Sequence, residues 1–359
     1  ACNACPTKQY KVSEACQGCL AHPCSEVCPK KAITIHHGKS HIDPEKCIKC
    51  GRCKEVCPYG AILKHDRPCA EACGMDAIGS DSLGRAEIDY DKCVSCGMCI
   101  VNCPFGAISD KGQIFQLIHA IKEGQRVIAI VAPAFVGQFG PNVSPEKLWS
   151  ALKQLGFAGV EEVAVGADLC SIEEAKDFMR AVPAEQPFMA TSCCPSWSVM
   201  AKKLFPDLAP YISMALTPMV LTARLIKQKD KDCKIAFIGP CSAKKLEASR
   251  RSIRSNVDFV LTFEEVMGMF AAKGVDLSKL EADHPLNDGT AGGRGFAVSG
   301  GVAKAVADVI HKWDPDREVK TVSAQGLRDC RKLLLAARAH KYDGFLLEGM
   351  ACPGGCVAG

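Results

Sequence analysis

The sequence has no large excess of charge and no long apolar segment. Lys and Arg total 44 and Asp and Glu total 40, which leaves a net charge of +4 over 359 residues. A charge this small predicts binding to neither nucleic acid nor an anionic membrane. No run of 18 apolar residues is present, so a transmembrane helix is not expected. The opening residues, Ala1-Cys2 onward, also lack the basic and apolar regions of a secretion signal.

Cysteine, by contrast, is abundant: the chain has 24, and 16 lie in the first 103 residues. Two runs share one spacing, Cys47-x2-Cys50-x2-Cys53-x3-Cys57-Pro58 and Cys93-x2-Cys96-x2-Cys99-x3-Cys103-Pro104. A variant precedes them, Cys16-x2-Cys19-x4-Cys24-x3-Cys28-Pro29, and Cys2-x2-Cys5 with Cys69-x3-Cys73 reads as one more run split by an insertion. Disulfide frameworks and zinc ribbons do not demand such triplets, whereas [4Fe–4S] clusters of the bacterial ferredoxin type do. The function must therefore involve moving electrons.

The spacing also predicts which cysteines share a cluster. Three close cysteines bind one cube and the fourth binds the neighbouring cube. The rule gives four sets: Cys16, Cys19, Cys24 and Cys57; Cys28, Cys47, Cys50 and Cys53; Cys73, Cys93, Cys96 and Cys99; and Cys2, Cys5, Cys69 and Cys103. The last set requires the N-terminus to fold back onto residues 69–103; alternatively Cys2, Cys5, Cys69 and Cys73 bind a separate cluster or none. Because the thiolates need a reducing compartment, we expect a cytoplasmic protein.

Each of the four runs ends in the same way. An Ala-Ile pair follows the fourth cysteine at residues 32–33, 61–62, 77–78 and 107–108. The repeat indicates a short turn that leads into a strand. Ile42-Asp43 and Ile88-Asp89 precede the second and fourth runs and predict the strand and turn that open each half of a ferredoxin unit. We therefore expect two α+β ferredoxin-like units in residues 1–110, with four [4Fe–4S] clusters.

Beyond Ser109, short apolar strands alternate with helical patterns. Strands are predicted at 127–131, 162–165, 234–238, 259–262 and 345–348, and helices at 147–155, 172–181, 263–272, 301–313 and 326–338. This alternation predicts an α/β domain with largely parallel sheets over residues 111–359.

Most of the remaining cysteines follow predicted strands. Such positions fall at the carboxyl edge of a parallel sheet, where ligands bind. The residues in question are Ala132, Pro133 and Ala134, Cys193 and Cys194, Cys241, and Cys352 and Cys356. We expect Cys194, Cys241, Cys352 and Cys356 to surround one metal centre, with the glycines before Cys356 letting the backbone approach the metal.

Three motifs carry a resemblance to a known family. They are Thr191-Ser-Cys-Cys-Pro-Ser-Trp197, Pro240-Cys-Ser-Ala-Lys-Lys-Leu-Glu247 and Met350-Ala-Cys-Pro-Gly-Gly-Cys356. Together with the ferredoxin-like repeats, they make the whole chain similar to the [FeFe]-hydrogenases. The resemblance implies reversible H2 oxidation at an H-cluster, a [4Fe–4S] cube joined by one thiolate to a diiron azadithiolate unit with CO and cyanide ligands. It also implies electron exchange with ferredoxin or a similar carrier, maturation proteins that insert the diiron unit, and an anaerobic setting.

The resemblance assigns roles to individual residues. Cys194, Cys241, Cys352 and Cys356 are implied as cube ligands, with Cys356 bridging to the diiron unit. Cys193 is implied as the proton relay and Lys244 as a donor to cyanide. Ala132, Pro133, Ala134 and Met350 are implied to line the diiron pocket. Glu174, Ser213 and Asp177 match the family's proton path, and Arg180 lies one position from its outermost arginine.

The chain also departs from familiar members of that family. Gly239 stands where they have Met, and Met219 where they have Gln. A sensory hydrogenase that reports H2 to a partner is one alternative function. A second is a non-catalytic, hydrogenase-like iron–sulfur assembly protein, but those proteins lack the adjacent pair Cys193-Cys194. Cys170, Cys233 and Cys330 belong to no set and are expected to be buried thiols.

Overall fold

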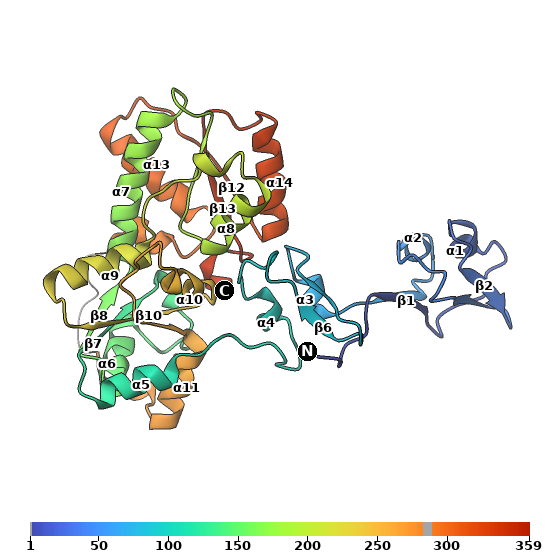
Figure 1. Cartoon of the computed structure of the whole chain (residues 1–359), viewed down its shortest axis with the longest axis horizontal. Helices are drawn as coiled ribbons and strands as arrows, with labels where there is room; N and C mark the ends of the chain where they lie inside the picture. The colour runs from blue at the N-terminus through green and yellow to red at the C-terminus, as the bar shows by residue number, and fades with distance from the viewer. Residues whose placement is uncertain (1, 283–288) are drawn as a thin grey trace. The chain divides into compact units, whose positions relative to one another are not determined.

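The computed structural model describes residues 2–282 and 289–359, which divide into two compact units. The first unit comprises Ala1–Asp91 and Cys99–Ile108, and the second comprises Lys92–Met98 and Ser109–Gly359. Figure 1 shows the first in blue to cyan and the second mainly in green to red. Among the described residues, no helix has both the length and the apolar character needed to cross a bilayer.

The first unit is made of antiparallel strand pairs and one-turn helices. β1 (Gln9–Val12) pairs with β4 (Ile62–His65), β2 (Ile33–His36) with β3 (Lys39–Ile42), and β5 (Ile78–Ser80) with β6 (Ala86–Ile88). The helices are α1 (Pro23–Glu26), α2 (Arg52–Glu55), α3 (Pro68–Glu71) and α4 (Met98–Val101), and each contains one cysteine. Three of the Ala-Ile pairs lead into strands, at β2, β4 and β5, which confirms the predicted ferredoxin-like α+β fold.

The second unit contains two parallel sheets. The first has the order β11-β10-β7-β8, formed by β11 (Phe259–Thr262), β10 (Lys234–Gly239), β7 (Val127–Val131) and β8 (Gly159–Glu162). All five residues of β7 are buried, as expected for a central strand covered on both faces. Around it lie α5 (Ile114–Lys122), α6 (Pro145–Leu155), α9 (Pro218–Lys229) and α11 (Phe263–Lys273), visible in the lower part of Figure 1.

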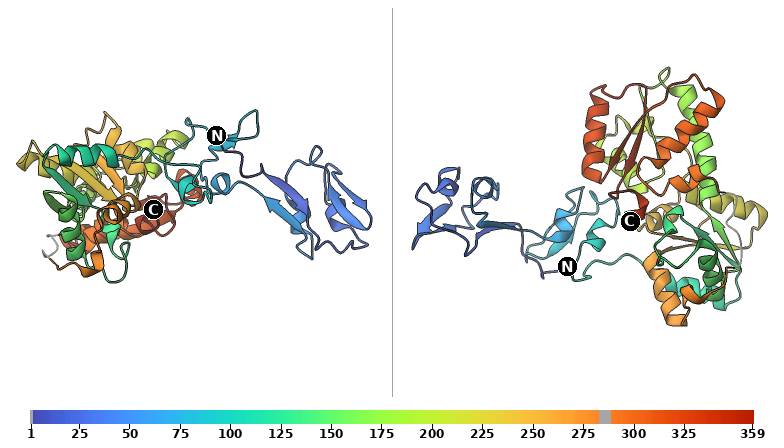
Figure 2. Two further views of the ribbon diagram at one scale, coloured as in Figure 1. Left: turned by 90° about the horizontal axis from the view of Figure 1, so that it is seen from below. Right: turned by 180° about the vertical axis from the view of Figure 1, so that it is seen from behind.

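The second sheet has the order β12-β13-β9. Its strands are β12 (Lys320–Gln325), β13 (Phe345–Met350) and β9 (Met189–Ala190). α7 (Ala164–Ala181) and α13 (Gly301–Trp313) lie on one side of this sheet and α14 (Leu327–Arg338) on the other, which Figure 2 shows again from behind. The remaining helices are α8 (Pro195–Leu204), α10 (Ala243–Ser249) and α12 (Ala291–Gly295). The α/β class with parallel sheets is therefore confirmed.

Local signals explain several helix ends. Ser144 caps α6 by accepting a hydrogen bond from the Lys147 N–H, and Gly156 ends the helix with φ +109°. At α11, Thr262 and Glu265 form a reciprocal capping box, and Gly274 closes the helix.

The predicted strand at 162–165 and the predicted start of the next helix are wrong. β8 ends at Glu162, and α7 begins at Ala164 rather than 172. Residues 163–167 are small or apolar and therefore resemble a strand, but they form the buried first turn of α7. Gly166 allows the close approach of α9, because a Cβ there would lie 2.5 Å from the Pro218 carbonyl oxygen.

Candidate functional site

The carboxyl ends of β7, β9, β10 and β13 meet around one pocket. Because these strands come from both parallel sheets, the pocket lies between the two halves of the second unit. It encloses about 820 Å³ not filled by protein atoms, part of it open to solvent. Its lining includes Ala132, Pro133, Ala134, Cys193, Cys194, Cys241, Lys244, Met350, Cys352 and Cys356. The structure therefore brings together residues from four distant segments that the sequence placed at strand ends.

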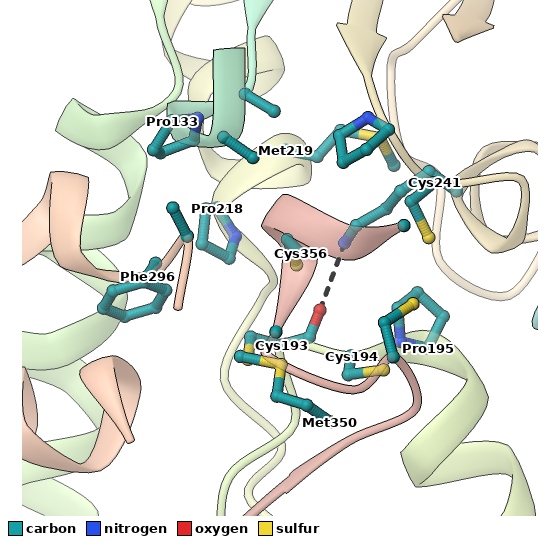
Figure 3. A pocket seen from close by; sticks show the side chains of 18 of the residues that line it. Pro133, Cys193, Cys194, Pro195, Pro218, Met219, Cys241, Phe296, Met350 and Cys356 are labelled. Carbon is teal, nitrogen blue, oxygen red and sulfur yellow. Dashed lines mark hydrogen bonds between the residues drawn. The ribbon is translucent and has the colours of Figure 1, made fainter. Parts of the chain in front are cut away.

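Sulfur atoms and apolar side chains dominate this pocket. Figure 3 shows Cys193, Cys194, Cys241 and Cys356 around its centre. Met350 lies below them, and Pro133, Pro218, Met219 and Phe296 lie above and to the left. In residues 2–282 and 289–359, no three His, Cys, Asp or Glu side chains are grouped closely enough to bind a single metal ion. The thiolates of a [4Fe–4S] cube each bind a different iron, so they need not converge on one point.

Trp197 and two glycines hold the cysteine loops together. The fully buried Trp197 donates from Nε1 to the Thr191 carbonyl at 2.9 Å, and its ring covers Gly349, where a Cβ would lie 2.2 Å from the ring. Gly355 has φ +96°, and a Cβ there would lie 2.5 Å from the Ser299 nitrogen. Gly355, one of the two glycines predicted to let the backbone approach the metal, also lets the Cys352–Cys356 loop pack against the backbone of residues 298–299.

Lys244 is the cation of the pocket lining. Its Nζ lies 2.6 Å from Oε2 of the buried Glu247 and donates to the Cys193 carbonyl at 3.2 Å, the bond drawn in Figure 3. Burial alone would lower the pKa of Lys244, but the charges of Glu247, Cys241 and Cys193 raise it overall. Two of the three ammonium donors are therefore engaged with protein, and the third is left for a group in the pocket. Glu247 ends the motif Pro240–Glu247, but the sequence alone did not identify it as the ion-pair partner of Lys244.

Cys193, which is partly buried, and Glu174, which is fully buried, are two proton-binding groups of this region. Burial, followed by the charge of Glu174, raises the pKa of the Cys193 thiol well above its usual value. Burial likewise raises the pKa of Glu174 to about 7. Glu174 Oε1 accepts from the Ser192 N–H at 3.2 Å, whereas Oε2 has no hydrogen-bond partner in the described residues. Both groups can thus carry a proton near neutral pH.

The other predicted path residues lie around Glu174. The Ser213 hydroxyl is close enough to lower the pKa of Glu174, although Oε2 of Glu174 has no partner at hydrogen-bonding distance in the part of the chain described. Asp177, one helical turn beyond Glu174 on α7, lies 3.0 Å from Arg180 in an exposed ion pair. α7 therefore carries carboxylates from the buried interior to the surface.

Glu174→Gln should stabilise the protein at alkaline pH. The pKa of this carboxyl is 4.5 in the unfolded chain and about 7 in the folded protein, so its ionisation lowers the free energy of unfolding. This loss of stability is absent below pH 4.5, grows between pH 4.5 and pH 7, and is constant above pH 7. The difference corresponds to about 3 kcal/mol. Urea unfolding at pH 4.5 and pH 8 measures it: the variant should gain stability only at pH 8. Glu173→Gln, which changes an exposed neighbour, should show no such dependence; equal stability of the Glu174 variant and the parent at pH 8 would contradict the raised pKa.

Phe237 is a pocket residue that sequence reasoning missed. It lies two positions before Gly239 on β10, so both residues face the same side of the sheet. A Cβ at residue 239 would lie 2.6 Å from the Phe237 ring and 3.0 Å from the Ala132 Cβ. The phenylalanine ring therefore occupies the space that a side chain at 239 would need. Phe296, Val163 and Ala167 also line the pocket and carried no sequence signal.

In the first unit, one predicted cluster set borders a single cavity. Its lining includes Cys16, Cys19, Cys24 and Cys57. Cys24 and Cys53 are buried with Ile33 and Ile62, and Cys28 and Cys57 pack against this group. In three of the four runs, the last cysteine accepts the same hydrogen bond. The Sγ atoms of Cys28, Cys73 and Cys103 accept from the backbone N–H groups of Ala32, Ala77 and Ala107, at 3.3–3.4 Å. The sequence repeat is thus a structural repeat around three of the four thiols.

These features define an iron–sulfur protein with a second, larger sulfur-lined pocket, and comparison with known families agrees. Residues 125–359 match the model of the iron only hydrogenase large subunit, C-terminal domain, and residues 40–63 and 86–109 match the 4Fe-4S binding domain. The chain belongs to the iron-only hydrogenase family.

Curated relatives include both hydrogenases and assembly proteins. The periplasmic [Fe] hydrogenase large subunit of Nitratidesulfovibrio vulgaris is 28% identical, over 89% of this chain and 85% of the relative. Iron hydrogenase 1 of Clostridium pasteurianum is also 28% identical, but the match spans 89% of this chain and only 64% of the relative. Cytosolic iron-sulfur assembly component 3 of Bos taurus is 27% identical, over 62% of this chain and 58% of the relative.

A solved structure has the same fold. The [FeFe]-hydrogenase HydA(deltaEFG), described in a study of stepwise H-cluster assembly, is 25% identical. The match has a TM-score of 0.58 and covers 69% of this chain and 84% of the other.

Proposed function

We propose that the protein is an [FeFe]-hydrogenase that interconverts H2 with protons and electrons. The supporting observation is that Cys193, Lys244 and four further cysteines from separate strand ends line one pocket. Cys194, Cys241, Cys352 and Cys356 would bind a [4Fe–4S] cube, and Cys356 would bridge to a diiron unit. Ala132, Pro133, Ala134 and Met350 would line the space for that unit.

The residues present fit this cofactor chemically. Soft thiolates suit an iron–sulfur cube, and the apolar wall suits small uncharged ligands such as CO. The unused donor of Lys244 suits a cyanide nitrogen, because a charged donor strengthens a hydrogen bond to an anionic group. When bound, the H-cluster would supply the cleavage and formation of the H–H bond, and the protein would position it and move protons.

The chain's own residues would carry the proton. Cys193 at the pocket can pass it toward Glu174, whose unpartnered Oε2 is an acceptor when ionised. Ser213 would connect Glu174 to Asp177, and Arg180 would hold Asp177 at the solvent end. The raised pKa of Glu174, about 7, suits repeated protonation and deprotonation at neutral pH.

Infrared spectroscopy of the matured protein tests this function. Bands from iron-bound CO and cyanide are expected, together with H2-dependent reduction of a dye. Maturation that yields neither the bands nor H2 turnover would refute the proposal. Matured Cys356→Ser protein, which lacks the bridging thiolate, should lose the bands and thus serves as the control.

The relative named as an assembly component supports a second candidate, a non-catalytic iron–sulfur assembly protein. Such a protein would bind iron–sulfur cubes and transfer them without H2 turnover. The adjacent Cys193 and Cys194 favour the hydrogenase, because the second cysteine supplies a ligand and leaves the first one available as a relay. Normal iron content with no CO or cyanide bands after maturation would favour the assembly function.

We further propose that residues 1–110 form an electron-transfer domain with four [4Fe–4S] clusters and that residues 111–359 form the catalytic domain. The first unit would exchange electrons with ferredoxin or a similar carrier. All 24 cysteines lie in described residues, and Cys50 is the one that is exposed. Exposed Ile48, Lys49, Arg52 and Lys54 surround it in the sequence. An acidic carrier would find there both positive charge and a short path to a cluster.

Reversing this charge should slow electron exchange. We expect the triple change Lys49→Glu, Arg52→Glu and Lys54→Glu to lower the rate with an acidic ferredoxin about tenfold or more at low salt, while the rate with a small viologen dye is unchanged. Arg250→Glu, Arg251→Glu and Lys312→Glu together alter the net charge equally and should have little effect. Equal slowing by both triple variants would place carrier docking elsewhere.

We also propose that the protein works in the cytoplasm, where thiolates stay reduced until clusters are inserted. Fractionation of the native cells tests this directly. Recovery from the periplasm, the compartment named for the Nitratidesulfovibrio relative, would refute it.

A further inference from the structure

Arg67 is a buried cation in the first unit. Arg67 lies between the end of β4 and the start of α3, and only 4% of its surface is exposed. The guanidinium donates to the Gly79 carbonyl at 2.9 Å and the Ser80 hydroxyl at 2.8 Å. It also donates to the Gly84 carbonyl and, from Nε at 3.4 Å, to the Cys5 carbonyl. These bonds tie the N-terminal segment to the hairpin of β5 and β6.

No carboxylate balances this buried charge. All four acceptors of the guanidinium are neutral, and within residues 2–282 and 289–359 Arg67 forms no ion pair with a carboxylate. The neighbouring Asp66 accepts only the Arg67 backbone N–H, at 2.9 Å, and its side chain lies 3.6 Å from Lys64. Burying a charge is costly unless an opposite charge or strong hydrogen bonds compensate it. A negative group beside Arg67 would remove that cost.

Four cysteines lie around the segments that Arg67 connects. The Cys2 carbonyl accepts the Ala86 N–H at 2.7 Å, which places the N-terminal segment beside β6. Cys5 is fixed through its carbonyl by Arg67, and Cys69 follows Arg67 by two residues in α3. Cys69 is buried, and Cys103 and Cys5 lie close enough to interact with it electrostatically. A cube with four thiolate ligands is anionic, so it would give Arg67 the negatively charged partner that it lacks.

We propose that Arg67 is the charge partner and positioning residue of a [4Fe–4S] cluster bound by Cys2, Cys5, Cys69 and Cys103. The inference rests on the iron–sulfur part of the proposed function and not on H2 turnover. Arg67 holds Cys5 in place by its carbonyl, and its positive charge stabilises the anionic cluster. The cysteines that would bind this cluster are separated by more than 60 residues between Cys5 and Cys69. Arg67 connects the two segments that carry them.

Iron quantitation of the full chain after anaerobic reconstitution tests this inference. Arg67→Gln should lose about four iron atoms per chain, the content of one cube, or should retain them with a lower midpoint potential for one cluster. Cys5→Ser should lose the same four atoms, and the double variant should lose no more than either single one. Arg67→Lys, which keeps the charge, should retain the iron. Exposed Arg251→Gln is the matched control and should retain all of it.

Two outcomes would overturn the inference. One is full iron content with unchanged potentials in Arg67→Gln. The other is a loss of iron in Arg67→Lys as large as in Arg67→Gln. That result would mean that Arg67 acts only through the hydrogen bonds of its guanidinium group to the backbone, and not through its positive charge. The CO and cyanide bands arise from the other unit, so failure of either test leaves the other interpretable.

Discussion

Cys193→Ala should reduce H2 turnover by at least about a hundredfold while the iron–sulfur cube stays bound. Cys193 lines the pocket with the four cysteines proposed as ligands, and burial keeps its thiol protonated. Removing a positioned proton donor typically costs a factor of about 10²–10⁴. Cys193→Ser should be nearly as slow, because a hydroxyl releases its proton far less readily than a thiol. H2 evolution with a dye and iron content measured on the same samples check both variants.

Cys233→Ser is the matched control for this pair. Cys233 is buried in the second unit, and its thiol donates to the Asp230 carbonyl at 3.1 Å, a bond that serine can replace. Turnover per loaded cluster should stay at the parent level. Loss of the cube itself in Cys193→Ala would instead show that Cys193 is a ligand and not a relay.

Lys244→Met should destabilise the second unit by about 3–5 kcal/mol, because it leaves Glu247 buried without its partner. The two side chains are joined at 2.6 Å and are only 11% and 5% exposed. Guanidinium chloride unfolding at neutral pH should show the loss. The variant should also load the diiron unit poorly, since it lacks the remaining donor.

A second substitution separates stability from function at this site. Lys244→Met with Glu247→Leu should recover most of the lost stability, since a buried ion pair can often be replaced by apolar side chains, but should not recover H2 turnover. Lys304→Met breaks an exposed pair with Asp308 and should cost under about 1 kcal/mol. Full turnover in the double variant would remove Lys244 from the proposed machinery.

The buried strands were predictable because their composition is mainly apolar. β7 and β11 occupy the predicted ranges, and β10 and β13 differ only at their ends. β12 was not predicted, since Lys320–Gln325 is mostly exposed and polar and its strand form depends on pairing with β13. α8 and α9 were missed for a related reason: each begins at a proline after a motif or turn, and the helix follows from packing against neighbouring elements.

The cysteines of the pocket were predictable from motif spacing, whereas its walls were not. Phe237 and Phe296 reach the pocket only because the two sheets meet there. Nothing in the local sequence distinguishes them from other buried aromatic residues. The same holds for Arg67, whose partners lie up to 62 residues away in the chain.

The aromatic ring beside Gly239 has a consequence for engineering this pocket. Installing at 239 the methionine of familiar hydrogenases would force two side chains into one volume, so the single exchange should misfold β10 or displace the wall. Positions 237 and 239 must therefore change together, a large residue at one requiring a small residue at the other. A library that varies them one at a time would therefore miss the combinations with a large residue at 239 and a small one at 237.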